Sequence, residues 1–177
     1  AFYANGKKLN EIGAQGPRSV VIDEPSAGRL QPPQPRLPIA NGVLPDSTRV
    51  VALRGALGIV GYAAGPSVHL VDLHGLSDPI ASRLEIGARG RPGHEKRLSN
   101  YWFVGRYAAA GAEEDLRVQA AREALSCPEL AELTAAVSSP LTLSRYVANV
   151  GAAYRLQDLR IPPDPSAAKR EVCGAGL

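Results

Sequence analysis

The chain contains no methionine and only two cysteines, Cys127 and Cys173, among its 177 residues. A complete translation product begins with methionine, so we expect the chain to be part of a larger or processed polypeptide. Two cysteines are too few for a structural zinc site unless histidines join them, and no histidine lies near either one in the sequence. They are therefore either two thiols or one disulfide.

Long apolar runs are also missing. The longest apolar region, residues 56–64, is interrupted by Gly58 and Gly61. It is much shorter than the roughly 18–20 apolar residues that a membrane-spanning helix needs. No signal peptide is recognisable at the start of the chain. The sequence therefore predicts a globular domain with a core of its own and no membrane span within these residues.

Lysine and aromatic residues are scarce. Only 5% of the residues are aromatic, and the net charge of +3 comes from scattered arginines that face similar numbers of acids. Nucleic-acid binding needs a clustered basic surface with aromatic side chains for stacking. The composition therefore argues against a nucleic-acid partner.

A short strand–helix–strand pattern lies in the first half of the chain. Residues 49–53 and 68–73 are rich in β-branched and aliphatic residues, and the apolar segment 55–65 between them is spaced by glycines. Such a pattern is typical of a parallel βαβ unit. Residues 19–22 add a β-prone run, and residues 1–13 have partial helical spacing. We predict an α/β fold with a small, mostly parallel, Rossmann-like sheet flanked by helices.

Proline dominates the segment 25–46, where it occupies positions 25, 32, 33, 35, 38 and 45. This composition predicts a long extended loop that wraps the domain or covers a site.

The last third of the chain is predicted to be helical. Acidic residues at 113–115 mark one helix start, Ser126 to Glu129 has the pattern of a capping box, and Ser139-Pro140 opens a third helix whose apolar face includes Tyr146 and Val150. We expect one domain over 1–177, with the Pro-rich loop at 25–46, an α/β core at 49–110, a helical part at 112–156 and a tail at 157–177.

The first segment that could carry chemistry contains Asp72, His74 and Asp78. Asp72 follows a buried strand, and ligands bind at the carboxyl ends of strands in open α/β sheets. Asp78-Pro79 has the pattern of a short helix start that runs to about Glu85. The three side chains could bind a sugar, another polar ligand or a metal. Alternatively, the aspartates are caps and His74 bonds to a backbone carbonyl.

The second such segment is the Gly-flanked loop 89–96, which contains His94, Glu95 and Lys96. Loops of this kind carry function more often than core elements do. A solvated charged loop is the alternative explanation. No spacing in either segment matches a zinc signature, and we predict neither a metal nor a cofactor.

Residues 55–96 resemble the soluble C-terminal domain of polytopic GT-C-type glycosyltransferases that use lipid-phosphosugar donors. The matching motifs are Gly-x-x-Gly-Tyr at 58–62, Asp-x-x-Gly-Leu at 72–76 followed by Asp78-Pro79, and Gly-His-Glu-Lys at 93–96. Trp102 and the segment 160–165 leading to Cys173 agree as well. Within this group the chain is most similar to the terminal β-arabinofuranosyltransferases of mycobacterial cell-wall arabinan synthesis.

The resemblance implies a membrane domain N-terminal to Ala1, a decaprenyl-phosphoarabinose donor, an arabinan acceptor and a location on the extracytoplasmic side of the cell membrane. It places the catalytic carboxylate in the absent membrane domain, so the chain alone is expected to be inactive. The resemblance also favours a disulfide between Cys127 and Cys173, which requires an oxidising compartment.

The residues expected to bind the acceptor glycan provide hydrogen bonds and one stacking face, and they are Asp72, His74, Asp78, His94, Glu95, Lys96 and Trp102. For Trp102 the alternative is an ordinary core aromatic. Two other functions stay open: a stand-alone extracytoplasmic carbohydrate-binding module, and a metal-assisted hydrolase that uses Asp72, His74 and His94.

Overall fold

The computed structural model of the protein describes residues 1–22, 35–111 and 114–174. The contacts group the chain into two compact units, Ala1–Leu73 with Phe103–Glu114, and His74–Trp102 with Asp115–Leu177. Helix α3 (Asn100–Tyr107) contributes its first residues to the second unit and its last residues to the first. Each unit has buried side chains of its own.

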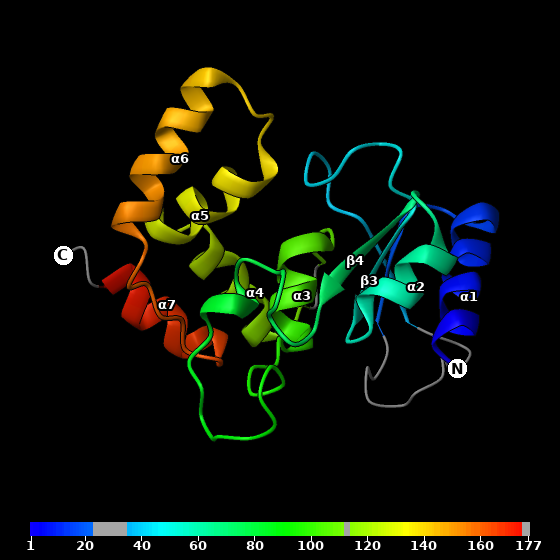
Figure 1. Ribbon diagram of the computed structural model, residues 1–177, viewed down its shortest axis with the longest axis horizontal. Coiled ribbons are helices and arrows are strands. Elements are labelled where there is room, and N and C mark those ends of the chain that lie inside the picture. Colours follow the sequence, from blue (N-terminus) through cyan, green and yellow to red (C-terminus); the bar gives the residue numbers. More distant parts are fainter. Residues whose placement is uncertain (23–34, 112–113, 175–177) are drawn as a thin grey trace. The chain divides into compact units, whose positions relative to one another are not determined.

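The first unit contains a four-stranded sheet (Figure 1). Its spatial order is β2 (Arg36–Pro38), β1 (Ser19–Val21), β3 (Val50–Arg54) and β4 (Val68–Asp72). The pairs β1–β3 and β3–β4 are parallel, and β2 is antiparallel to β1. The predicted α/β class with a mostly parallel sheet is therefore confirmed.

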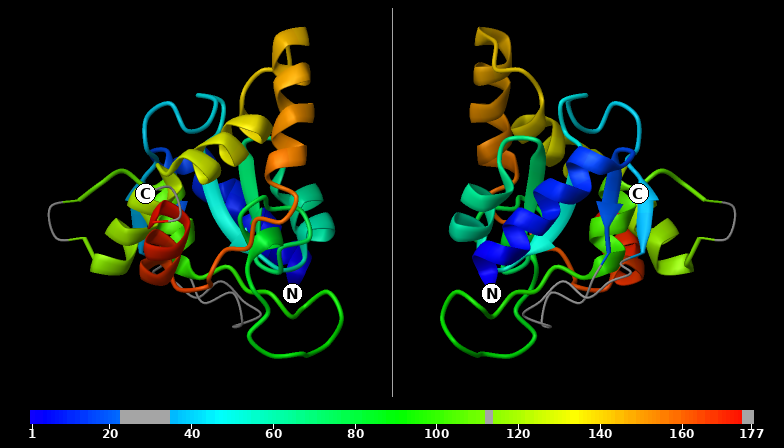
Figure 2. Two further views of the ribbon diagram at one scale, coloured as in Figure 1. Left: turned by 90° about the vertical axis from the view of Figure 1, so that its left-hand side faces the viewer. Right: turned by 90° about the vertical axis from the view of Figure 1, so that its right-hand side faces the viewer.

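Two helices pack against each other beside this sheet, α1 (Phe2–Gln15) and α2 (Leu57–Ala64) (Figures 1 and 2). Helix α2 connects the parallel strands β3 and β4, as the sequence predicts. Gly6 lets the helices approach closely, since a Cβ atom there would lie 2.6 Å from the Cβ of Ala63. The buried apolar side chains between the helices and the sheet are Leu9, Ile12, Val21, Val50, Ala52, Val60 and Ala64.

The Pro-rich segment 25–46 differs from a continuous loop near its middle. Residues 23–34 lie outside the described residues, but Arg36–Pro38 forms strand β2 at the edge of the sheet. Ile22 N–H donates to the Pro35 carbonyl at 3.0 Å, which continues this pairing. A proline cannot donate to a ladder, and an edge strand needs partners on one side only. This position is therefore compatible with Pro35 and Pro38.

The second unit contains four helices after residue 115, namely α4 (Leu116–Leu125), α5 (Pro128–Ser138), α6 (Leu143–Arg155) and α7 (Pro165–Gly174). The predicted helical C-terminal third is confirmed. Helix α7 packs on α4, and a disulfide joins Cys127 to Cys173 with their Cα atoms 5.4 Å apart. The segment expected as a tail therefore contains a helix bonded covalently to the rest of the unit.

Two helix starts differ from the predicted ones. Ser126 does not cap α5: its hydroxyl donates to the Glu123 carbonyl at the end of α4, and Cys127 occupies the cap position without a capping hydrogen bond from its side chain. Helix α6 begins at Leu143 rather than at Ser139-Pro140. Thr142 caps it, since its hydroxyl accepts from the Arg145 N–H at 3.2 Å.

The helix predicted from Asp78 to about Glu85 is reduced to one 3₁₀ turn, η1 (Ala81–Arg83). After this turn, Leu84 forms an isolated parallel β-bridge with Ile161. The Ile161 N–H donates to the Arg83 carbonyl, and the Glu85 N–H donates to the Ile161 carbonyl, both at 2.9 Å. These bonds take the place of a continued helix.

Candidate functional site

The first predicted segment turns sharply after strand β4. Asp78 is buried, and its Oδ1 accepts from the Ile80 N–H at 3.0 Å and the Ala81 N–H at 2.9 Å. This is the capping role that the sequence suggests as one of two possibilities. Asp78 therefore holds the turn rather than presenting an open carboxylate.

Gly75 makes this turn possible. Its φ is +74°, and a Cβ atom built on it would lie 2.5 Å from the Ala81 carbonyl oxygen. Both the left-handed conformation and the close approach exclude a side chain. The residues on either side, His74 and Leu76, are thereby brought onto the surface of η1, with His74 half-buried and Leu76 exposed.

The second predicted segment is a loop closed by its own hydrogen bonds. The His94 N–H donates to the Arg91 carbonyl at 2.9 Å, and Gly93 adopts a φ of +78°. The Lys96 ammonium donates to the Ser82 carbonyl oxygen beside η1. Lys96 therefore anchors the loop to the 3₁₀ turn.

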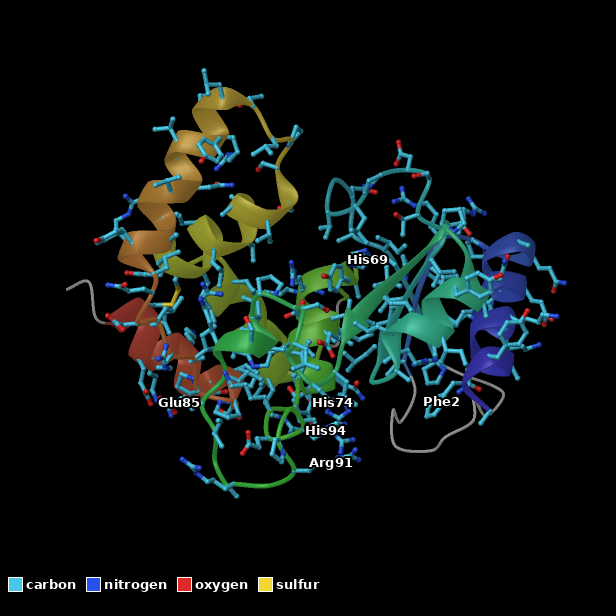
Figure 3. All side chains as sticks on the ribbon, viewed as in Figure 1. Phe2, His69, His74, Glu85, Arg91 and His94 are labelled. Carbon is cyan, nitrogen blue, oxygen red and sulfur yellow. A yellow bond between two sulfur atoms is a disulfide. The ribbon has the colours of Figure 1, made fainter. Side chains whose placement is uncertain are left out.

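The two segments meet at a pair of histidines. The imidazole rings of His74 and His94 have centroids 4.4 Å apart and planes inclined by 53° (Figure 3). A Cβ atom on Gly93 would lie 3.9 Å from the Leu76 Cδ2, so the loops also touch beside the rings. We call residues 74–77 and 93–96 the two-loop surface.

The chemistry of this surface suits a neutral polar ligand. The imidazole of His94 is exposed, and its Nδ1 lies 3.4 Å from the Pro92 carbonyl oxygen, so Nε2 is the ring nitrogen that a ligand would meet. The Leu76 side chain, which is 75% exposed, adds an apolar contact. Glu95 is half-buried next to them in the chain, and the exposed Arg91 lies near His94 (Figure 3). Hydroxyl groups and one apolar edge of a ligand could be recognised together here.

Asp72 belongs to the first unit, whereas the two-loop surface belongs to the second. Asp72 ends strand β4 in the first unit, is 3% exposed, and lies in register with the buried Arg54 of β3. Register partners on parallel strands point to the same face of a sheet. Asp72 and Arg54 are therefore buried at neighbouring positions on the same face of β4 and β3.

Trp102 takes the core role rather than the stacking role expected for it. Its side chain is 2% exposed, and the indole N–H donates to the Pro163 carbonyl at 3.0 Å. A buried indole presents no open face to a sugar ring. The partner Pro163 belongs to the motif 160–165 singled out in the sequence, so the two parts of the resemblance meet in one structural contact.

Two further aromatic residues that flank Trp102 in the chain, Tyr101 and Tyr107, also have partners. Tyr107 is buried, and its hydroxyl lies 3.4 Å from the His69 Nε2 in the first unit. The Arg117 guanidinium lies over the ring of Tyr101, 3.9 Å from its centroid. Two parts of the two-loop region were not predicted from the sequence, the side chain of Leu76 and the backbone carbonyl of Ser82. A glycine after a strand end, followed by an apolar residue, was the only signal for Leu76.

Among residues 1–22, 35–111 and 114–174, no three His, Cys, Asp or Glu side chains gather closely enough to hold a metal ion. The ligand set that a metal-assisted hydrolase would need, Asp72 with His74 and His94, is not assembled there. None of the helices in the same residues is long and apolar enough to cross a membrane.

Comparison with known proteins identifies the family. Residues 35–171 match the family model described as the AftB family C-terminal domain. The terminal beta-(1->2)-arabinofuranosyltransferase of Mycobacterium tuberculosis is 30% identical over 116 residues, which are 62% of this chain and 18% of that protein. The enzyme of the same name from Corynebacterium glutamicum is 32% identical over 99 residues, or 53% of this chain and 14% of that protein.

The chain thus spans less than a fifth of the length of these curated relatives. No solved structure matches it. Because the family model covers most of the chain, from the edge strand β2 into helix α7, the protein belongs to the AftB C-terminal domain family.

Proposed function

We propose that this chain is the extracytoplasmic domain of a membrane arabinofuranosyltransferase and that its two-loop surface binds the arabinan acceptor. The family match over residues 35–171 carries the first part of the proposal. Both relatives are named as terminal arabinofuranosyltransferases, which supports arabinan as the glycan.

The acceptor site rests on the pairing of His74 with His94. Imidazole nitrogens form hydrogen bonds with sugar hydroxyls in either direction, and the adjacent exposed Leu76 can cover a carbon face of a furanose ring. Lys96 keeps the loop in place through the Ser82 carbonyl. The surface therefore combines polar groups that are held in position with an apolar contact, as small-molecule sites do.

The transfer reaction itself is placed outside this chain. The two-loop surface contains a single carboxylate, Glu95, and the aspartate beside it, Asp78, is engaged as a cap. More than four fifths of each relative lies outside the match. We assign the catalytic carboxylate and the decaprenyl-phosphoarabinose site to a membrane domain N-terminal to Ala1. The purified chain is then expected to bind glycan without transferring arabinose.

The disulfide supports the extracytoplasmic location. Bridges such as Cys127–Cys173 persist in oxidising compartments and are rare in the cytosol. A chain on the outer side of the membrane also has direct access to cell-wall glycan. The gene sequence upstream of Ala1 tests this part, because the proposal requires several membrane spans there. A gene that encodes no such spans would contradict the proposal and favour the alternative of a stand-alone carbohydrate-binding module.

Titration of the purified chain with a synthetic arabinofuranoside oligosaccharide, followed by NMR or calorimetry, tests the acceptor site. We expect His94→Ala to weaken binding by about ten-fold or more, which corresponds to the loss of one to two good hydrogen bonds. Tyr62→Ala is the control, because it removes a ring that is 85% exposed on α2. Equal affinity of His94→Ala and the unmodified chain would contradict the assignment.

A further inference from the structure

Helix α6 is attached to its own unit by its polar side. The side-chain amide of Asn149 in α6 donates to the Ala136 carbonyl of α5 at 2.9 Å. Arg155 at the end of α6 forms an ion pair with Glu132 of α5. Ala152 is the one residue of α6 that is fully buried. Figure 2 shows α5 (yellow) and α6 (orange) from two sides.

The opposite side of α6 is apolar and exposed. Five large side chains, each between 54% and 81% exposed, form what we call the α6 stripe: Leu143, Tyr146, Val147, Val150 and Tyr154. Their spacing of three, four, seven and eleven residues places them on one side, within an arc of about 100°. Helix α6 separates apolar from polar residues more strongly than any other helix in the described chain.

This orientation is the reverse of that in an ordinary surface helix, which turns its apolar side to the core. The apolar area continues beyond α6, since Val137 at the end of α5 and Leu141 in the connecting loop are also exposed. Contiguous apolar patches of this kind mark interaction sites in soluble proteins. The α6 stripe therefore requires a partner.

The charges around the stripe indicate which partner. From Leu133 to Gln157 the chain contains no Asp or Glu, and its only charged residues are Arg145 and Arg155. A second arginine-bearing segment follows at Arg160. Glu132 is paired with Arg155 and Asp158 follows the helix, so both signs of charge occur near the stripe. The segment 133–157 itself adds arginine and no acid, which is compatible with anionic lipid headgroups over an acyl layer.

The length and the aromatic content of α6 are consistent with a bilayer surface. Thirteen residues form a helix of about 20 Å, which is too short to span the hydrocarbon core but long enough to lie along its boundary. Tyr146 and Tyr154 each have an apolar ring and a polar hydroxyl, the combination that favours the interface between headgroups and acyl chains.

We propose that α6 lies on the surface of an anionic lipid bilayer, with the α6 stripe inserted at the acyl boundary and Arg145 and Arg160 near the headgroups. This inference is independent of glycan binding by the two-loop surface. A chain that binds glycan but not vesicles would contradict the lipid proposal alone. A chain that binds vesicles but not glycan would contradict the acceptor site alone.

Sedimentation with vesicles tests the proposal. The purified chain is expected to bind vesicles of phosphatidylcholine with about 30% phosphatidylglycerol, less well to phosphatidylcholine alone, and less well as salt is raised. The double variant Val147→Glu/Val150→Glu should bind about ten-fold or more weakly, because two charges enter the apolar side. Both positions are more than half exposed, so an unchanged circular dichroism spectrum and thermal midpoint are expected.

The control is Leu116→Glu, which makes the same kind of change at a leucine that is 78% exposed on α4. Vesicle binding of this variant should equal that of the unmodified chain. Absence of binding to anionic vesicles would overturn the proposal. So would a dimer in solution that the double variant abolishes in the absence of lipid, since a second copy would then cover the stripe.

Discussion

Trp102 shows at the scale of one residue how burial decides between two roles. An exposed tryptophan near a Gly-rich loop could stack on a sugar, but this indole is buried and its N–H is bonded to Pro163. We therefore expect Trp102 to contribute to stability rather than to recognition.

Trp102→Phe is expected to lower the free energy of unfolding by about 2–3 kcal/mol, because it removes a hydrogen bond and leaves unfilled volume. Urea denaturation measures the change. Tyr62→Phe, at an exposed site, should stay within about 0.5 kcal/mol of the unmodified chain. A stacking role would instead show as reduced glycan affinity at unchanged stability.

Gly75 and Gly42 form a matched pair at the same scale. Both have a φ near +75°, but a Cβ atom at Gly42 would meet no atom within 4 Å, whereas one at Gly75 would collide with the Ala81 backbone. Gly42→Ala should cost about 1 kcal/mol from the left-handed conformation alone. Gly75→Ala should cost clearly more and weaken glycan binding, since the two-loop surface must shift. Equal losses of stability for Gly75→Ala and Gly42→Ala in thermal unfolding would show that the backbone at Ala81 moves away from the new Cβ atom at no cost.

Some residue roles could be predicted from sequence and others could not. Asp78 before a proline is a recognisable cap, and its bonds to Ile80 and Ala81 agree with that pattern. The contact of His74 with His94 joins residues 20 positions apart in a segment without periodicity, so no local pattern specifies it. The sequence also offers no measure of burial for an isolated tryptophan such as Trp102.

At the scale of the element, the start of α4 combines a cap with an ion pair. Asp115 Oδ1 accepts from the Arg117 N–H at 2.8 Å, and the Arg117 guanidinium lies 3.2 Å from the other carboxylate oxygen. The side-chain bond from Arg117 is the main reason that the pKa of Asp115 lies below its usual value. The folded chain therefore holds the ionised form more strongly than the unfolded chain does.

A group of this kind contributes stability above the pKa of the unfolded chain and loses that contribution as the pH falls through the lowered pKa. Asp115→Asn keeps a capping side chain but removes the charge. Its thermal midpoint should therefore fall less steeply than that of the unmodified chain below about pH 4. Asp158→Asn, at an exposed position, serves as the control. Parallel midpoint curves for Asp115→Asn and the unmodified chain would contradict this explanation.

Elements with strong periodicity were predictable, and elements set by distant partners were not. Strands β3 and β4 and helix α2 follow from apolar runs in the sequence. Strand β2 ends in a proline, Pro38, and forms because β1 offers an open edge. The turn η1 ends at Arg83 because the next residue, Leu84, forms a β-bridge with Ile161, which is distant in the sequence.

At the scale of the whole molecule, the expected single domain over 1–177 remains a prediction. The chain passes between the two compact units at three points, after Leu73, after Trp102 and after Glu114. The crossing after Trp102 lies inside α3, where neither a glycine nor a proline stands, so composition gives no sign of it.

The disulfide closes a long loop of the second unit, because Cys127 and Cys173 have a sequence separation of 46. Its removal should lower the free energy of unfolding by about 2–4 kcal/mol, because the unfolded chain gains freedom. Urea denaturation of the variant Cys127→Ser/Cys173→Ser measures this loss. The unmodified chain in reductant should lose a similar amount. If neither the double variant nor the reduced chain lost stability, the packing of α7 on α4 would be enough to hold α7 in place without the disulfide.

The same bridge has a consequence for how the molecule responds to proteolysis. A protease cut in the exposed connection between α5 and α6, near Leu141, separates the polypeptide into two fragments that Cys127 and Cys173 still link. The nicked molecule would migrate as one species without reductant and as two with it. Helix α6 would thereby gain a free end while staying attached to its unit.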